Sequence, residues 1–159
     1  MSGLNAHIDE KRSALDSFLS PRSVAVIGAT DREGTVGRTV FERLRAGTFR
    51  GRIYPVNLNH IEVLGLRAYS KIGEIPEKVD LAVIVTPAVT VPGVIGECVD
   101  AGVRAAVVIS AGFKERGAEG AALEFEIQKQ LRRGVLRLVG PNCLGVMNPH
   151  IGLNATFAQ

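Results

Sequence analysis

The chain has 159 residues, and its 19 Lys and Arg exceed its 16 Asp and Glu by only three, with the basic residues scattered. This length suits one domain that needs no disulfide or metal for stability, and the charge does not indicate nucleic-acid binding. No segment resembles a signal peptide or a membrane span, and Cys98 and Cys143 lack the number and spacing of a disulfide framework or a zinc site. We therefore expect a reduced, cytoplasmic protein without a metal.

Five short apolar runs predict the strands of a parallel sheet. The chain is 46% apolar but only 5% aromatic, and within these runs aliphatic residues are continuous rather than alternating with polar ones. Continuous apolar runs are typical of strands that are buried on both faces. The strands are expected at residues 23–28, 52–56, 80–86, 104–110 and 136–140.

Helical patterns lie between most of these runs, and a short amphipathic helix is expected before the first. The helices are predicted at residues 4–18, 35–46, 91–101 and 118–133, with a short strand near 66–69 and a helical turn near 72–75. Strands that alternate with helices predict an α/β fold with a Rossmann-like, doubly wound parallel sheet in a single domain. We expect an N-terminal helix and lead-in at 1–20, the domain at 21–150, and the start of a linker to a following domain at 151–159.

A glycine-rich turn follows the first predicted strand and opens a helix. Backbone N–H groups and a helix N-terminus at such a turn form a site for a phosphate. Its glycines are spaced Gly-x5-Gly-x2-Gly, which is longer than the dinucleotide fingerprint, so a tight turn without a ligand stays an alternative. The candidate ligand-contacting residues of this turn are Gly28, Thr30, Gly34, Thr35, Val36 and Gly37.

The second strand ends at Val56 and Asn57, where many NAD-binding domains place an acidic residue on the ribose hydroxyl. A neutral residue here suits a nucleotide with a phosphate on its ribose, because a carboxylate would repel that phosphate. NADP and coenzyme A both carry such a phosphate. A polar turn without a ligand role is the alternative for Asn57.

Three further turns place small residues at the carboxyl ends of strands, where doubly wound sheets bind their ligands. Together they predict one crevice with room for an extended ligand. Cys143 is interpreted as a small packed residue and Cys98 as a core residue, and no catalytic residue is indicated by the three histidines. The candidate site residues in these turns are Thr86, Pro87, Ser110, Ala111, Gly112, Asn142 and Cys143.

Six segments carry a family resemblance by their order along the chain. They are SPRSVAVIGA at 20–29, IYPVN at 53–57, DLAVI at 80–84, ISAGF at 109–113, GPNCLG at 140–145 and NATF at 154–157. In this order they resemble the coenzyme A-binding domain of NDP-forming acyl-CoA synthetases, which are relatives of the succinyl-CoA synthetase alpha subunit. The resemblance covers nearly the whole chain from Phe18 onward.

The resemblance implies a position for each part of coenzyme A. The phosphates would contact Thr30 and residues 34–37, Val56 and Asn57 would flank the adenosine, and the pantetheine end would lie toward Asn142 and Cys143. Thr86, Pro87, Ser110, Ala111 and Gly112 would border the rest of the molecule. Many relatives have Pro-Lys after the strand-two Asn, whereas this chain has Leu58 and Asn59, so Arg32, Arg38 or His60 is expected to supply the positive charge.

In the resembled family, acyl-CoA forms from an acyl acid, ATP and coenzyme A, and the phosphohistidine of the reaction belongs to a following domain. The resemblance therefore implies a coenzyme A-binding module that is not catalytic by itself and whose partners are coenzyme A and the following domains of a parent ligase. A protein lysine acetyltransferase with a fused GNAT domain is an alternative parent. An NADP-binding oxidoreductase domain and a ligand-sensing module are the remaining alternatives.

Overall fold

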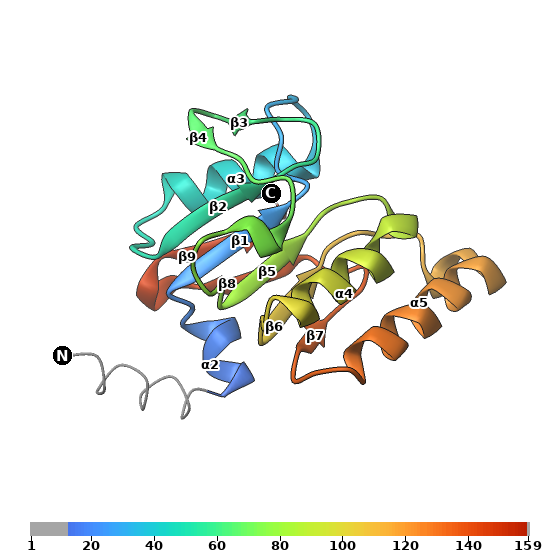
Figure 1. Cartoon of the computed structure of the whole chain (residues 1–159). Helices are drawn as coiled ribbons and strands as arrows, with labels where there is room; N and C mark the ends of the chain where they lie inside the picture. The colour runs from blue at the N-terminus through green and yellow to red at the C-terminus, as the bar shows by residue number, and fades with distance from the viewer. Residues whose placement is uncertain (1–12, 159) are drawn as a thin grey trace.

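The computed structural model describes residues 13–158 and contains a five-stranded parallel sheet with the strand order β2-β1-β5-β6-β7 (Figure 1). This arrangement confirms the predicted Rossmann-like α/β fold. Each strand lies within a predicted apolar run, and four of the runs extend one or two residues beyond the strand at their carboxyl ends. The strands are β1 (Ser23–Ile27), β2 (Arg52–Val56), β5 (Leu81–Ile84), β6 (Ala105–Val108) and β7 (Arg137–Val139).

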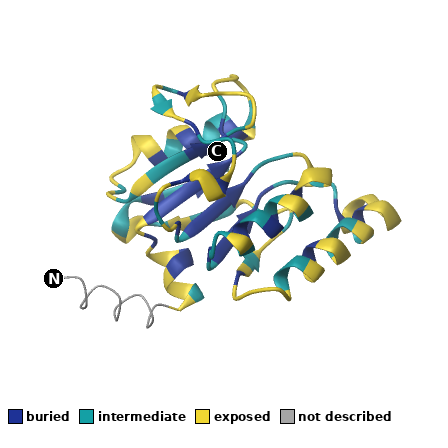
Figure 2. Ribbon diagram, viewed as in Figure 1, coloured by how far each residue is buried: buried dark blue, intermediate teal, exposed yellow. Residues whose placement is uncertain are grey.

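Helices cover both faces of the sheet, and the two faces have separate hydrophobic cores. On one face, α4 (Val91–Asp100) and α5 (Ala118–Leu131) lie side by side, and α3 (Val36–Ala46) covers the other (Figure 1). Alternate residues of each strand enter opposite cores, since successive strand side chains point to opposite faces: Ala82 and Ile84 face α4, whereas Leu81 and Val83 face α3. Figure 2 shows the resulting band of buried residues through the central strands.

The segment between β2 and β5 contains the short elements that the sequence predicted, with one addition. The strand expected near 66–69 is half of a hairpin, in which β4 (Leu66–Arg67) pairs antiparallel with β3 (Glu62–Val63). Leu64 and Gly65 form its turn with φ values of 47° and 79°. The helical turn predicted near 72–75 is the 3-10 helix η1 (Ile72–Glu74).

Only the last part of the predicted N-terminal helix falls on described residues. The helix α2 (Ala14–Leu19) begins at Ser13, whose side chain and that of Asp16 form a reciprocal capping box, and Phe18 is buried against the α3 face. Residues 4–12 of the predicted helix lie outside the described residues. Within the described residues, no helix has the length and apolar character to cross a bilayer.

The C-terminal residues contain a pair of antiparallel strands. Within the segment 151–159, where the start of a linker is predicted, β9 (Leu153–Thr156) pairs antiparallel with β8 (Gly145–Asn148) and packs against α3. Leu153 and Ala155 are buried in the core on that face. The Asn-Ala-Thr sequence lacks the aliphatic run of the sheet strands, and the segment is a strand through its pairing with β8. A following domain stays a prediction.

Truncating Leu153 tests whether β9 belongs to the folded domain. Leu153 is 1% exposed, so Leu153→Ala should leave a cavity and lower the free energy of unfolding by about 2–5 kcal/mol. Val135, which is 71% exposed, provides the control, and Val135→Ala should change the free energy of unfolding by less than about 0.5 kcal/mol. Urea denaturation measures both. Equal, small effects would show that residues 153–156 are not part of the core.

Candidate functional site

All the turns singled out in the sequence leave the carboxyl edge of the same parallel sheet. Backbone hydrogen bonds join neighbouring turns: Gly28 N–H donates to Val56 O, Val85 N–H to Ile27 O, and Ile109 N–H to Ile84 O. The strand order reverses between β1 and β5, because the chain passes from β1 to β2 on one side and returns to β5 on the other. Ligands of doubly wound sheets bind at this reversal.

The turn between β1 and α3 brings a helix N-terminus to the end of the central strand. Thr35 is the N-cap of α3: its hydroxyl accepts from the Arg38 N–H at 3.3 Å and donates to the Arg32 carbonyl at 2.7 Å. The Thr30 hydroxyl accepts from the Arg32 N–H at 3.2 Å. These hydrogen bonds join residues of the same loop and hold its conformation. The first backbone N–H groups of α3 are thereby directed toward the carboxyl edge of the sheet.

Two glycines let α3 approach β1 closely. A Cβ atom at Gly37 would fall well inside van der Waals distance of the Gly28 carbonyl oxygen, so no larger residue fits there without displacing the helix. Gly28 has φ +100°, and a Cβ there would lie 3.0 Å from Val85 Cγ2. Gly34, with φ +72°, has no neighbour within 4 Å of such an atom and leaves the loop surface open.

Asn57 holds the end of β2 to the β1 turn. Its side-chain Nδ2 donates to the Ala29 carbonyl at 2.8 Å, and its Oδ1 accepts from the Asn59 N–H at 2.8 Å. The side chain therefore has a structural role, as expected for the alternative in which Asn57 belongs to a polar turn without contacting a ligand. It also leaves this end of β2 without a carboxylate.

The β3–β4 hairpin is tied to the same turn by Asp31, which the sequence analysis did not single out. The Asp31 carboxylate accepts from the Leu64 N–H at 2.6 Å, and the Arg45 guanidinium donates to the Leu64 carbonyl at 2.5 Å. Arg38 in turn donates to the Asp31 backbone carbonyl. An aspartate in a glycine-rich turn was the available signal, but its partner is 33 residues away in the sequence.

The turns after β5 and β6 are also connected by side chains. The Ser110 hydroxyl donates to the Thr86 carbonyl at 2.5 Å, and Thr90 donates to the Thr86 hydroxyl at 2.9 Å. Pro87 precedes the short helix η2 (Ala88–Thr90), which leads into α4. The Ser110 hydroxyl and the Thr86 carbonyl thus bind each other, and this hydrogen bond fixes the relative position of the two turns.

A cavity of about 630 Å³ lies beside these turns, between the starts of α4 and α5. Three of the predicted residues, Ala111, Gly112 and Asn142, line it, together with the small or apolar Ala88 and Leu123. Its charged lining residues are Glu115, Arg116 and Glu119. The shape and the mainly neutral wall suit a flexible, largely uncharged chain.

Cys143 lies against the sheet. Its thiol is 3.3 Å from the Val108 carbonyl, and it packs against the α3-side core. Burial raises the pKa of the Cys143 thiol, and burial raises that of Cys98 to about 12. Both cysteines are free, as a packed residue and a core residue would be.

Asn142 has φ +54°, and its backbone N–H donates to the Ser110 carbonyl at 2.9 Å.

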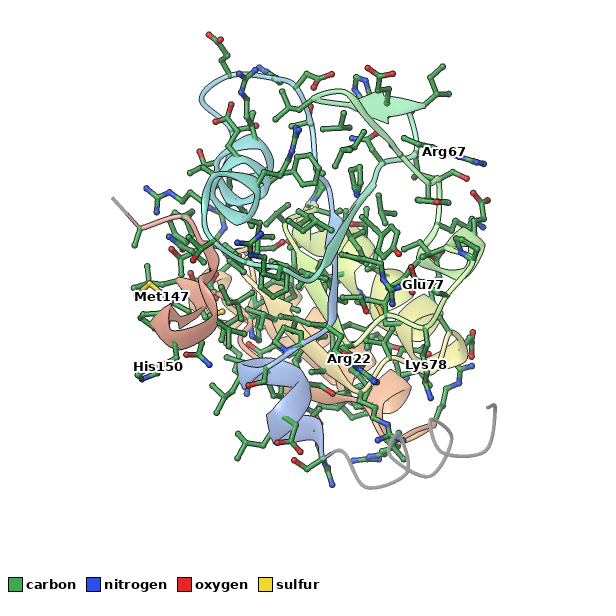
Figure 3. The ribbon with its side chains drawn as sticks, turned by 90° about the vertical axis from the view of Figure 1, so that its left-hand side faces the viewer. Arg22, Arg67, Glu77, Lys78, Met147 and His150 are labelled. Carbon is green, nitrogen blue, oxygen red and sulfur yellow. The ribbon has the colours of Figure 1, made fainter. Side chains whose placement is uncertain are left out.

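The predicted cations differ in how far they are already paired. Arg38 forms an ion pair with Glu42 at 2.8 Å, whereas Arg32 and His60 have no hydrogen bond or ion pair from their side chains to another described residue. Other basic residues lie elsewhere: Figure 3 shows Arg22 and Lys78 at the end of the sheet opposite Arg67 and the β3–β4 hairpin. Residues 13–158 contain no group of three or more potential metal ligands.

A family model described as a CoA binding domain matches residues 22–149. The chain belongs to this family of CoA-binding domains. It is 49% identical over 145 residues to the ADP-forming acetate–CoA ligase I of Archaeoglobus fulgidus, covering 91% of this chain and 21% of that protein. It is 45% identical to the alpha subunit of the ADP-forming acetate–CoA ligase II of Pyrococcus furiosus, covering 90% and 31%.

Solved structures show the same relationship. The dinucleotide-forming acetyl-coenzyme A synthetase 1 of Ca. Korarchaeum cryptofilum, solved with phosphate and ADP, matches with a TM-score of 0.86 and 39% identity over 91% of this chain and 31% of that one. This CoA-binding domain therefore spans about a fifth to a third of the length of these relatives. The family resemblance is confirmed. These relatives are named as acetate–CoA ligases or acetyl-coenzyme A synthetases, and they give no support to the acetyltransferase and oxidoreductase alternatives.

Gly37→Ala tests the close approach of α3 to β1. The added methyl group would overlap the Gly28 carbonyl and force the helix away, which should cost about 1–3 kcal/mol of unfolding free energy. Gly93→Ala is the matched control, because Gly93 also lies in a helix and has no neighbour within 4 Å of the added atom. Thermal unfolding of both variants distinguishes overlap from helix propensity. A Gly37→Ala protein as stable as the control would contradict this packing.

The cysteine environments predict slow alkylation. Because burial raises the pKa of Cys143, its thiolate fraction at pH 7 should be below that of a free thiol, and its reaction should accelerate only above the usual cysteine pKa. Cys98 should react only when the protein unfolds. Mass spectrometry after iodoacetamide treatment at several pH values, with glutathione as the reference thiol, measures both rates. Modification of Cys143 as fast as glutathione at pH 7 would contradict the packed position.

Proposed function

We propose that this domain binds coenzyme A along the carboxyl edge of its sheet and supplies it to an ADP-forming acyl-CoA synthetase. The observation that carries the proposal is the turn between β1 and α3. There Gly37 lets the N-terminus of α3 lie directly over the end of β1, next to the point where the strand order reverses. A helix N-terminus presents N–H groups and a positive dipole end to a phosphate. The phosphates of coenzyme A are proposed to lie there, near Thr30, Gly34, Thr35 and Val36.

The distribution of charge along the edge supports one orientation of the ligand. Arg32 and His60 lie at the α3 end, whereas the cavity near α5 has two carboxylates, Glu115 and Glu119, against one Arg116. Backbone hydrogen bonds, the one from the Gly112 N–H first, lower the pKa of the Glu115 carboxyl, so it is ionised at neutral pH. Phosphates are disfavoured beside these carboxylates. The uncharged pantetheine arm is therefore proposed to occupy the 630 Å³ cavity past Ala111, Gly112 and Asn142.

The remaining predicted residues have structural roles in this proposal. Asn57 fixes the end of β2 and leaves it uncharged, so that the ribose phosphate near Val56 meets no carboxylate there. Thr86, Pro87 and Ser110 set the distance between the β5 and β6 turns. Cys143 supports the turn after β7 from behind. These residues shape the site more than they offer it hydrogen-bonding groups.

The parent protein is proposed to form acyl-CoA, ADP and phosphate from an acyl acid, ATP and coenzyme A. Support comes from the relatives, which are named as ADP-forming acetate–CoA ligases and which are several times longer than this chain. The nucleotide and the phosphohistidine of the reaction would be held by following domains. The two free cysteines are consistent with a reduced, cytoplasmic location.

Preference for coenzyme A over NAD tests the proposal. A ligand at a hundredfold excess over its Kd stabilises the folded state by about 2.7 kcal/mol, which corresponds to a rise of about 5–10 °C in Tm for a domain of this size. Coenzyme A should produce this rise in differential scanning fluorimetry, and NAD at equal concentration should produce little. A larger rise with NAD or NADP would contradict the proposal.

Dephospho-coenzyme A serves as the control for the ribose phosphate. An equal rise in Tm with both forms would show that Leu58 and Asn59 leave the ribose phosphate without a partner. A smaller rise would show that another cation contacts it. Arg32→Ala or His60→Ala should then remove the difference, because neither side chain has another described partner.

A further inference from the structure

The turn between β6 and α5, residues 109–117, forms one wall of the 630 Å³ cavity and is fixed at several points. Phe113 is fully buried in the core beneath it. The Ser110 carbonyl accepts from the Asn142 N–H at 2.9 Å, and the Ser110 hydroxyl donates to the Thr86 carbonyl. These contacts hold both ends of the four-residue stretch 110–113 but not the peptide between Ala111 and Gly112, which faces the cavity.

Glu115 holds that peptide. Its Oε1 atom accepts from the Gly112 N–H at 2.5 Å, and hydrogen bonds from the backbone of Gly112, Phe113 and Glu115 itself lower the pKa of the carboxyl. The contact is local, because the 3-10 helix η3 (Lys114–Arg116) turns the chain back toward Gly112. Gly112 has φ +112°, a conformation that side chains disfavour and that an added contact helps to hold.

Little room separates this peptide from the opposite wall. A Cβ atom at Gly112 would lie 3.0 Å from the Cβ of Ala88, and both residues line the cavity. A small rotation of the peptide toward Ala88 would therefore narrow the space between the β5 and β6 turns. We therefore expect the position of the Gly112 N–H to affect how much room an extended chain has there.

We propose that Glu115 is a positioning residue for coenzyme A: by holding the Gly112 N–H, it keeps the Ala111–Gly112 peptide out of the path of the pantetheine arm. This inference rests on the proposed function, since it requires coenzyme A in this cavity. Glu115 acts through the backbone and needs no contact with the ligand. Its effect on the path of the pantetheine arm comes from the position of its carboxylate oxygen, and this effect is separate from the repulsion of phosphates by its charge.

A set of four variants separates position from charge. Glu115→Ala removes both the acceptor and the charge, Glu115→Asp keeps the charge but shortens the side chain, and Glu115→Gln keeps an acceptor oxygen at the same reach without the charge. Glu126→Ala is the matched control, because Glu126 is an exposed glutamate of the adjoining helix α5 and does not line the cavity.

Isothermal titration calorimetry with coenzyme A and amide exchange of Gly112 by NMR are the two measurements. Glu115→Ala and Glu115→Asp should raise the Kd by about fivefold or more, as expected when a preorganised site loses order, and should speed Gly112 exchange. Glu115→Gln should stay within about twofold of wild type in Kd, as should Glu126→Ala. The exchange measurement reports on the hydrogen bond without any ligand.

Several results would overturn the inference. An unchanged Kd in Glu115→Ala together with faster Gly112 exchange would show that the peptide position does not affect binding. A loss in Glu126→Ala as large as in Glu115→Ala would show that the effect is not specific to this turn, and a Glu115→Gln protein that binds as weakly as Glu115→Ala would assign the effect to charge. If Glu115→Ala does not fold, the Kd values of Glu115→Asp and Glu115→Gln are compared instead. Weaker binding by Glu115→Asp supports the role of position, and weaker binding by Glu115→Gln supports the role of charge. Wild-type protein that fails to bind coenzyme A would refute the proposed function itself, before any variant is compared.

Discussion

The close approach of α3 to β1 is the contact on which the rest of the site depends. The Gly28 carbonyl lies where a side chain at Gly37 would otherwise be, so the first turn of α3 sits directly over the end of a central strand. This places the helix N-terminus at the reversal of strand order, which is also where the β5 turn begins. A helix displaced by one methyl group would move its free N–H groups away from the edge and open the packing of Val85 against Gly28.

Around that contact, polar side chains mostly bind backbone groups of neighbouring turns. Asn57 binds the β1 turn, Asp31 binds the β3–β4 hairpin, and Ser110 binds the β5 turn. Each of these bonds joins segments that are distant in the sequence but adjacent at one edge of the sheet. The result is a rim whose shape is set before a ligand arrives, which lowers the cost of ordering loops on binding. Specific recognition is then left largely to backbone N–H groups and cavity shape.

Family membership and the structure give different kinds of information about this chain. The relatives identify a CoA-binding domain within longer ADP-forming ligases. The structure shows which groups remain available at the edge, and they are fewer than the predicted site suggested. Several predicted residues have already used their hydrogen-bonding groups within the protein. Arg32, by contrast, keeps an unpaired guanidinium among the described residues, next to the turn with the free helix N-terminus.

The sequence by itself determined the layered fold and the edge of the sheet at which the candidate turns meet. Continuous aliphatic runs specify buried strands, and parallel strands bring their carboxyl ends to one edge, so residues from 28 to 143 could be assigned to one rim without coordinates. The tertiary structure decided what local pattern does not encode. Residues 153–156 form a strand because α3 and β8 cover them, and Asn57, Asp31 and Glu115 acquire their roles from backbone partners. The partners of Asn57 and Asp31 are distant in the chain, and that of Glu115 depends on how a nearby turn folds back. Such pairings depend on three-dimensional distance and on the direction of single N–H groups, which a one-dimensional pattern does not specify.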